Sequence, residues 1–269
     1  MIVTNRDSKL LEKLGSFGIF STQQIQRVFF KEIDLSTVRR RLRKLEKADL
    51  IRRVEGLDKG GVGWCLTLKA ARVVGIESPF FHFNRSTLHH EILLSELRLS
   101  LEAVGVGDQW TPEHVLRAEA WRTRSGKKPE KELIPDGICS VVYKEEKQKV
   151  AIELELTLKH RARYEKVFNA YLKRKDLWGV WYFVPSERMG RILDEVWRKV
   201  NRNNRNDLFM WSLLNQALRD PWNLEVHFSG NRHPMRKLIT MKQPSALPGA
   251  PTQGMGTAIN ANTKPLLAA

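Results

Sequence analysis

Apolar residues recur at intervals of three and four along the first part of the chain, a spacing typical of amphipathic helices. Three such stretches follow one another: SKLLEKLGSFG, STQQIQRVFF and LSTVRRRLRKLEKADL. Ser21 and Ser36 are the expected N-caps of the second and third. The next segment, LIRRVEGLDKGGVGWCLTL, indicates two strands joined by a glycine-rich tip. This order predicts a winged helix-turn-helix domain over residues 1–78.

A different pattern runs from residue 79 to residue 242. The stretch RSTLHHEILLSELRLSLEAVGVG predicts a long helix with Ser86 as its possible cap, apolar over a face broad enough for deep burial. DGICSVVY and VAIELELT flank the polar turn KEEKQK, which predicts an antiparallel hairpin. HRARYEKVFNAYLKRK then predicts a helix, and LWGVWYFVP predicts a strand buried on both faces.

A strand, a helix and a buried strand in succession usually form a parallel crossover. We therefore expect residues 79–242 to form a mixed sheet with helices packed on it, and the whole chain to be of the α/β (α+β) class. Residues 186–242 are expected to add helical material. Residues 243–269 are rich in Pro, Gly, Ala and Asn and carry almost no charge, which predicts a disordered tail.

The charge balance indicates a polyanionic partner. The chain has 46 Lys+Arg against 30 Asp+Glu, a formal net charge of +16, and such an excess favours nucleic acid. Four basic residues share the face of the third predicted helix that lies opposite its apolar stripe: Arg39, Arg40, Arg43 and Lys47. We expect this face to enter a DNA groove, although a merely solvated face is the alternative.

Two further observations restrict the class of protein. The longest apolar run, WGVWYFV, is far shorter than the roughly 20 residues that span a bilayer, so we expect no membrane insertion. The only cysteines, Cys65 and Cys139, exclude a disulfide framework and suit a reducing compartment. The first residues contain no apolar segment of the signal-peptide kind, and we expect a cytoplasmic protein.

Acidic residues gather around the predicted hairpin. Glu153 and Glu155 alternate onto one face of its second strand, and the hairpin can bring Asp136 beside them. Three carboxylates on a basic protein repel one another unless a cation neutralises them, and oxygen ligands suit Mg²⁺ or Mn²⁺. Such an ion could activate water beside a phosphate, and Lys159 could stabilise the charge that develops. A half-exposed strand would show the same alternation.

A family resemblance rests on two of these motifs. LIPDG followed after a short hairpin by IELELTLK resembles the PD-(D/E)xK nuclease core, with Asp136 as first acid and Glu153 as second. Glu155 stands where that motif usually has Lys, and Lys159 lies four residues further on. With the preceding winged helix, this arrangement is similar to the MobC-type plasmid mobilization relaxases and to the broader replication-relaxation family, over roughly residues 5–185.

The resemblance implies a restriction-endonuclease-like domain that nicks DNA with the help of Mg²⁺ or Mn²⁺, without a tyrosine nucleophile. The implied substrate is the transfer origin of a bacterial plasmid, bound as double-stranded and single-stranded DNA during conjugation. An accessory mobilization protein and a coupling protein are the implied partners. Asp136, Glu153 and Glu155 would be metal ligands. The implied catalytic residues are these three with Lys159, Glu91 and His90.

Basic residues after the hairpin fit the same interpretation. Arg161 and Arg163 open the helix that follows it, where they could hold a strand by its phosphates. Two other functions remain open. A non-catalytic plasmid replication or copy-control protein could bind DNA through the same winged helix. A duplex-cutting endonuclease would give linear product in place of nicked circles.

Overall fold

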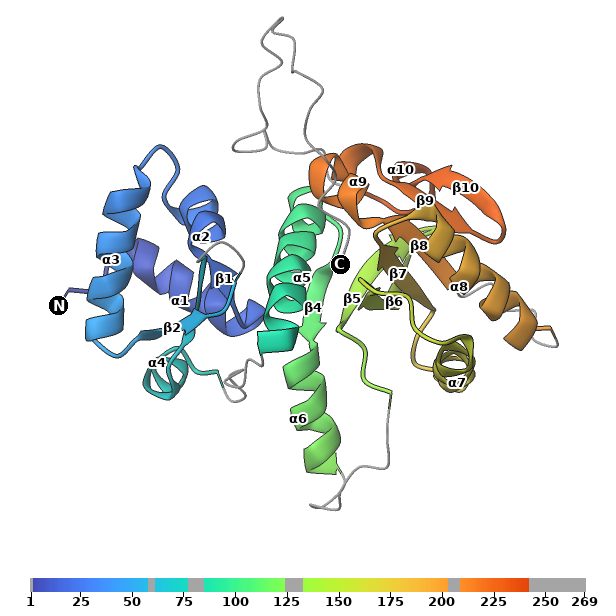
Figure 1. Ribbon diagram of the computed structural model, residues 1–269, viewed down its shortest axis with the longest axis horizontal. Helices are drawn as coiled ribbons and strands as arrows, with labels where there is room; N and C mark the ends of the chain where they lie inside the picture. Colours follow the sequence, from blue (N-terminus) through green and yellow to red (C-terminus); the bar gives the residue numbers. More distant parts are fainter. Residues whose placement is uncertain (1, 58–60, 77–84, 124–132, 203–208, 242–269) are drawn as a thin grey trace, which may run out of the picture.

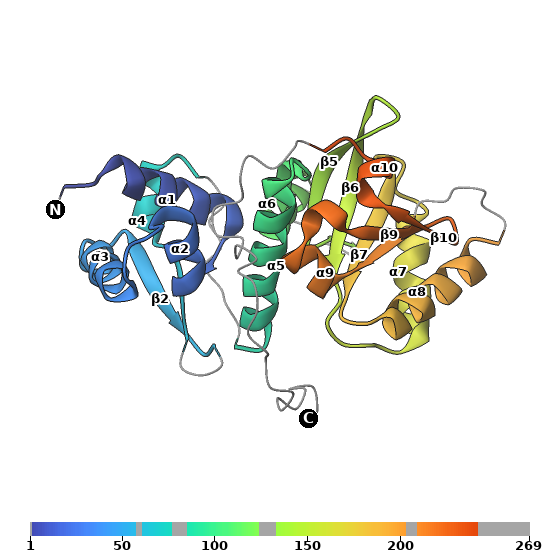
Figure 2. The same ribbon diagram turned by 90° about the horizontal axis from the view of Figure 1, so that it is seen from above.

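The computed structural model describes residues 2–57, 61–76, 85–123, 133–202 and 209–241. Figure 1 shows a helical N-terminal part and a larger sheet part, with the long helix α5 (Arg85–Ala103) standing between them. Figure 2 shows the same arrangement from above. The predicted tail and the tip of the wing at residues 58–60 lie outside the described residues.

The N-terminal part has the order and strand pairing of a winged helix. Its elements are α1 (Asn5–Phe17), β1 (Phe20–Ser21), α2 (Thr22–Phe29), α3 (Leu35–Lys47), β2 (Ile51–Glu55), β3 (Val62–Leu66) and α4 (Leu68–Val73). The strands form an antiparallel sheet in the order β1-β3-β2. Leu14, Ile25 and Leu42, one from each predicted helix, are buried in a single core. The three helices and the hairpin are therefore present as predicted.

The helix starts were predicted less well than the helices. Ser21 is the N-cap of α2 and forms a capping box, as expected. The N-cap of α3 is Asp34, whose carboxylate accepts hydrogen bonds from two backbone N–H groups of the first turn. Helix α5 already begins at Arg85. The predicted caps Ser36 and Ser86 are wrong because both residues lie inside the first turn of their helices.

The sheet part is built on a mixed sheet of seven strands. They are β4 (Asp108–Pro112), β5 (Gly137–Tyr143), β6 (Glu146–Leu154), β7 (Gly179–Val184), β8 (Phe209–Leu213), β9 (Glu225–Phe228) and β10 (Asn231–Pro234). Their order is β10-β9-β8-β7-β6-β5-β4, with β6, β7 and β8 parallel and the other pairs antiparallel. The predicted β5-β6 hairpin turns at Lys144 and Glu145, whose positive φ values of 50° and 68° suit a type I′ turn.

Helices cover both faces of this sheet. They are α6 (Glu113–Thr123), α7 (Arg161–Tyr171), α8 (Glu187–Val200), α9 (Leu214–Arg219) and α10 (Met235–Leu238), besides α5. Helices α7 and α8 pack on one face, while α5 and α9 pack on the other. Strand β7 is buried throughout, as predicted for a central strand.

Residues 186–242 add helical material, as expected, in α8, α9 and α10, but the strands β8, β9 and β10 in the same range were not predicted. Short apolar runs such as FMWSL do not distinguish a buried strand from a buried helix by period. None of the helices in the described ranges is both long enough and apolar enough to cross a membrane.

Candidate active site

The predicted carboxylates lie together on the face of the sheet that α7 and α8 cover. Gly137 pairs with Ile152 across the hairpin, so Asp136, just before β5, lies opposite Glu153 near the end of β6. Ile138 and Ala151 point to the core under α7 and α8, and alternation places Asp136 and Glu153 on that same face. The hairpin register therefore brings the two acids side by side, as the sequence predicted.

A close backbone approach explains why glycine follows Asp136. The indole of Trp110, on the neighbouring strand β4, lies over Gly137, and a Cβ at that position would come within 2.6 Å of the indole nitrogen. Such a contact is shorter than van der Waals packing tolerates. Trp110 is itself buried in the core, so its ring holds the start of β5 from the side of α5.

Asp136 is held by the backbone of the facing strand and by His90 of α5. Its Oδ2 accepts a hydrogen bond of 2.7 Å from the backbone N–H of Leu154. The Nε2 of His90 lies 3.3 Å from the same oxygen and 3.0 Å from the carbonyl oxygen of Leu154. Both neighbours of Nε2 are acceptors, so this nitrogen must carry a proton.

Acidic neighbours control the charge of His90. Burial disfavours its charged form, but the hydrogen bonds and charges of Asp136 and Glu91 outweigh burial and raise the pKa of His90 to about 11. The imidazolium is thus one cation that balances the carboxylates. The adjacent His89 points to solvent.

Glu153 receives a hydrogen bond from the hydroxyl of Tyr171 on α7. Burial, and then the negative charge of Asp136, raise the pKa of Glu153 well above its usual range, although the hydrogen bond from Tyr171 and the charge of Lys159 oppose the shift. The pKa of Tyr171 is also raised, first by burial and then by Glu153. Burial and the neighbouring carboxylates therefore favour the neutral forms of Glu153 and Tyr171.

Glu155 and Lys159 form a pair at the end of β6. The ammonium of Lys159 lies 2.7 Å and 2.8 Å from the two carboxylate oxygens of Glu155, which is only 7% exposed. The backbone N–H of Glu155 donates to Phe183, which extends the β6-β7 ladder. Lys159 thus reaches the carboxylate face, the face of the sheet that carries Asp136, Glu153 and Glu155, from a position four residues after Glu155. The nuclease motif usually has its lysine at the position that Glu155 occupies in this chain.

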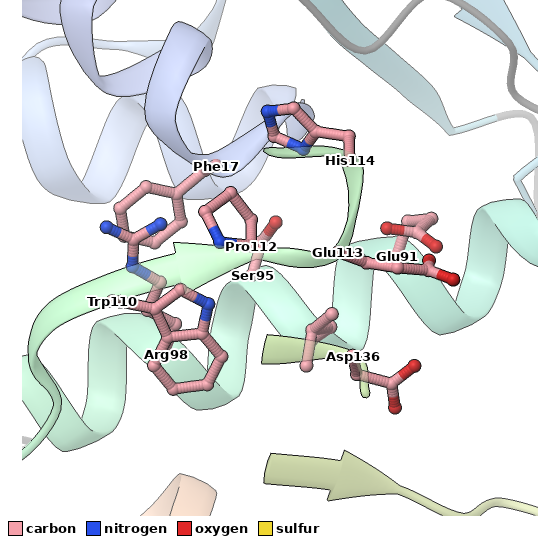
Figure 3. Close-up of a pocket in the computed structure, with 10 residues that line it drawn as sticks. Phe17, Glu91, Ser95, Arg98, Trp110, Pro112, Glu113, His114 and Asp136 are labelled. Atoms are coloured by element: carbon pink, nitrogen blue, oxygen red, sulfur yellow. The ribbon is translucent and has the colours of Figure 1, made fainter. Parts of the chain in front are cut away.

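Two further side chains at the site, Glu113 and Tyr171, were not predicted. Figure 3 shows Glu91 of α5, Glu113 at the start of α6, and Asp136 lining one pocket. Burial raises the pKa of Glu113, and the charges of Asp136 and Glu91 add to the shift, against an ion pair with Arg117. Tyr171 lies within the predicted helix HRARYEKVFNAYLKRK, and its hydroxyl gave no signal of a role at the site. Glu113 directly follows Pro112, a helix-start signal that could have drawn attention to it.

The donor atoms fit the predicted cation by class, because hard divalent ions take carboxylate oxygens. Burial is the largest cause of the raised pKa of Glu153, and the charge of Asp136, which such an ion would neutralise, adds to it. Each carboxylate nevertheless has a protein partner, and within the described residues no group of three His, Cys, Asp or Glu side chains is arranged to hold a metal ion. The metal-ligand roles of Asp136, Glu153 and Glu155 stay predictions.

The predicted DNA-binding residues form two separate groups. Four side chains are exposed along one face of α3: Arg39, Arg40, Arg43 and Lys47. Arg41, between them, turns inward to Asp7. On α7, Arg163 is exposed and Arg161 pairs with Glu195 at 2.9 Å. Helices α3 and α7 lie at opposite ends of the molecule in Figures 1 and 2, so the fold does not unite these residues in one patch.

Comparisons with known proteins give one extensive match. The sequence profile of the family described as replication-relaxation matches residues 11–176, which is more than half of the chain. No curated protein matches. A solved structure, the zinc-responsive MarR family member ZitR of Lactococcus lactis, is 17% identical, covers 46% of this chain and 76% of that chain, and has a TM-score of 0.24. A structural similarity with so low a TM-score supports no conclusion about fold or function.

Proposed function

The chain belongs to the replication-relaxation family, and from this premise we propose that it is a plasmid DNA nickase that binds the transfer origin for mobilization. Family membership by itself indicates a role related to plasmid replication or relaxation and an interaction with DNA. One observation carries the finer proposal. Asp136, just before β5, lies opposite Glu153 on β6, and the pKa of Glu153 is raised by burial and by Asp136.

The proposed recognition surface is the exposed face of α3. No apolar side chain is exposed among the basic residues of this face. The third helix of a winged helix is the element that enters a major groove. Arg40 and Arg43 are placed to contact phosphates or base edges. A transfer origin bound in this way would be held as a duplex by α3, and the cut strand would reach the sheet part. An accessory mobilization protein and a coupling protein remain the proposed partners.

The proposed cut takes place at the carboxylate face. Asp136 and Glu153 would hold Mg²⁺ or Mn²⁺, with Glu155 as a further ligand if Lys159 releases it. The ion would supply charge stabilisation at the phosphate and a more acidic water. His90 keeps Asp136 oriented, and Tyr171 keeps Glu153 oriented. Lys159 is a cation within reach of the same face, and its partial exposure permits contact with a strand.

A second candidate function is favoured by one specific observation. Each of the three carboxylates is already paired within the protein, as in a domain that no longer needs a metal. The chain would then be a non-catalytic replication or copy-control protein that binds DNA through the winged helix and uses the sheet part as a scaffold. Titration with Mn²⁺ separates the two candidates, because a scaffold has no reason to bind the ion at Asp136.

The decisive experiment uses supercoiled plasmid that carries the DNA flanking the protein's own gene. The native chain, Asp136→Asn and Glu153→Gln are incubated with Mg²⁺, Mn²⁺ or EDTA, and Glu146→Gln, exposed on the same strand as Glu153, is the matched control. We expect open circles with the native chain and the control in metal, and intact supercoils with EDTA or either site variant.

Each other outcome has a definite meaning. Linear product would point to a duplex endonuclease. Supercoils that survive in all reactions, while the DNA still shifts on a gel, would overturn the nickase and leave the DNA-binding scaffold. Absence of a gel shift with native chain would overturn both candidates.

A further inference from the structure

Helix α5 belongs to both parts of the molecule. Leu94, Leu97 and Leu101 on one side enter the core of the sheet part. Leu88 on another side packs with Ile19 of the winged helix. Apolar residues are accordingly distributed around the helix, as expected of a helix buried on more than one side. The two parts therefore share an element of structure and do not merely touch.

Buried polar contacts also fix the orientation of α5 against the winged helix. The hydroxyl of Ser95 donates to the carbonyl of Ile19 at 2.8 Å, and Ser95 is 3% exposed. Nη1 of Arg98 donates to the carbonyl of Ser16 at 2.6 Å, and its guanidinium lies 3.8 Å from the ring centroid of Phe17. Such bonds have one satisfied geometry, because a shift of α5 against the winged helix would leave buried groups unpaired.

Glu96 lies at the edge of the contact between α5 and the winged helix, which we call the junction. Its carboxylate accepts a hydrogen bond of 2.9 Å from the side-chain amide of Gln24 and bonds of 2.5 Å and 2.7 Å from Arg27. The same amide donates to the carbonyl of Ile92 at 3.0 Å. Gln24 and Arg27 belong to α2, which packs against the recognition helix α3. This links the position of α3 to α5.

The same helix also reaches the carboxylates. His90 and Glu91 lie on α5, and His90 contacts both Asp136 and the carbonyl of Leu154. The pocket between α5, β4 and the winged helix has a volume of only about 20 Å³, so the two parts are closely packed there. One rigid helix thus connects the face that would read DNA with the face that would cut it.

We propose that α5 acts as a ruler, with Ser95, Glu96 and Arg98 as the positioning residues that fix where the carboxylate face meets DNA once α3 is bound. This inference rests on the proposed function, because it assumes that α3 binds DNA. It predicts one contact position on the strand at a constant offset from the recognition site. A flexible junction would give a range of positions, as is usual for domains with small polar interfaces.

The test avoids dependence on nicking. Leu158→Cys, exposed in the loop between β6 and α7, carries a tethered iron-EDTA group that cleaves nearby DNA whether or not the protein is a nuclease. Cys65 and Cys139 stay unlabelled, because burial removes them from reagents and raises their pKa to about 11 and about 12. We expect one compact cluster of cleavages on the bound site.

Variants at the junction should disperse that cluster. Glu96→Lys puts a like charge beside Arg27, and Glu96→Ala is the milder form in case Glu96→Lys does not fold. Glu225→Lys, which faces Arg232 in β9 and β10, is the matched charge reversal away from the junction. We expect cleavage to spread over a roughly twofold longer segment in the Glu96 variants only. An unchanged pattern in folded Glu96→Ala would overturn the ruler.

A distance measurement decides the case even if the protein binds no DNA. Spin labels at Lys44→Cys on α3 and at Leu158→Cys report the separation of the two parts in solution. The ruler predicts a single narrow distribution, which broadens in Glu96→Lys and stays narrow in Glu225→Lys. A broad distribution in the otherwise native chain would overturn the inference, whereas a narrow one without DNA binding would reject the proposed function, and with it the role of α5 on DNA, while leaving the rigid junction.

Discussion

Helix α3 and the carboxylate face, which carries Asp136, Glu153 and Glu155, differ in how they accommodate charged side chains. Along the outer face of α3, Arg39, Arg40, Arg43 and Lys47 are exposed. At the end of β6, Glu155 is buried and Glu153 is partly buried, and each depends on a partner from another position, Lys159 or Tyr171. An exposed charge costs the fold little free energy, whereas a buried charge is destabilising unless an opposite charge or a hydrogen bond compensates it.

Asp7 and Arg41 make the contrast clear within the winged helix itself. Arg41 lies among the exposed arginines of α3 but turns inward, and its guanidinium binds the carboxylate of Asp7, which is 1% exposed. Neighbouring arginines on one helix are therefore divided between an internal ion pair and the exposed face that we propose to bind DNA. The same residue type has different roles because helical rotation directs one side chain to solvent and the next to the core.

The largest expected effect is at Glu153. Glu153→Gln removes a proposed metal ligand, and we expect nicking to fall by about a thousandfold or more, since metal charge stabilisation is worth several kcal/mol. Stability should stay equal or rise, because burial and Asp136 already disfavour the charged form of Glu153. Plasmid nicking and urea unfolding measure the two quantities. A variant that nicks normally, or that is much less stable, would contradict the assignment.

A large effect on stability is expected at Arg41. Arg41→Gln leaves the carboxylate of Asp7 buried without its main partner, and we expect a loss of about 2–4 kcal/mol in the free energy of unfolding. Arg40→Gln, the exposed neighbour, should change it by less than about 0.5 kcal/mol. Urea titration followed by circular dichroism compares them. Equal stability of the two variants would show that the Asp7 pair contributes nothing.

The reverse order is expected for DNA binding. Arg40→Gln should weaken binding to all sequences and reduce the slope of log affinity against log salt by about 1, the value for one lost phosphate contact. Fluorescence anisotropy at several salt concentrations gives this slope. Lys144→Gln, exposed at the turn of the β5-β6 hairpin, is the control. A slope that does not change would remove Arg40 from the proposed interface.

The smallest expected effect is the change with pH of the stabilisation that Asp7 provides, because this change is confined to acid pH. Burial opposes ionisation, but hydrogen bonds from Arg41 and Thr4 outweigh it and lower the pKa of Asp7 below its model-peptide value of 3.8. A lowered folded-state pKa stabilises the fold above pH 3.8, and this contribution is lost as pH falls through the folded-state pKa. We expect the native chain to lose its advantage over Asp7→Asn only in that acid range. Urea midpoints from pH 7 to pH 2 would test this, and a constant difference would refute it.

Local pattern predicted much of this molecule. Periodicity found the three helices of the winged helix, the β5-β6 hairpin and the buried strand β7, and alternation placed Glu153 with Asp136 on one face. Apolar runs without a clear period did not predict β8, and the β9-β10 hairpin was missed as well. Helix starts were displaced because several polar residues in a row can serve as cap, and only backbone geometry selects one.

The sequence by itself determined the three helices of the winged helix, the β5-β6 hairpin with its acids, the strand β7 and the exposed basic face of α3, because each depends on spacing within one segment. Tertiary structure decided which partner compensates each buried charge: His90 for Asp136, Tyr171 for Glu153 and Lys159 for Glu155. It also decided that α5 is shared by two cores. These facts depend on contacts between residues far apart in sequence. Buried polar groups must find partners wherever the fold supplies them, and no local period records that choice.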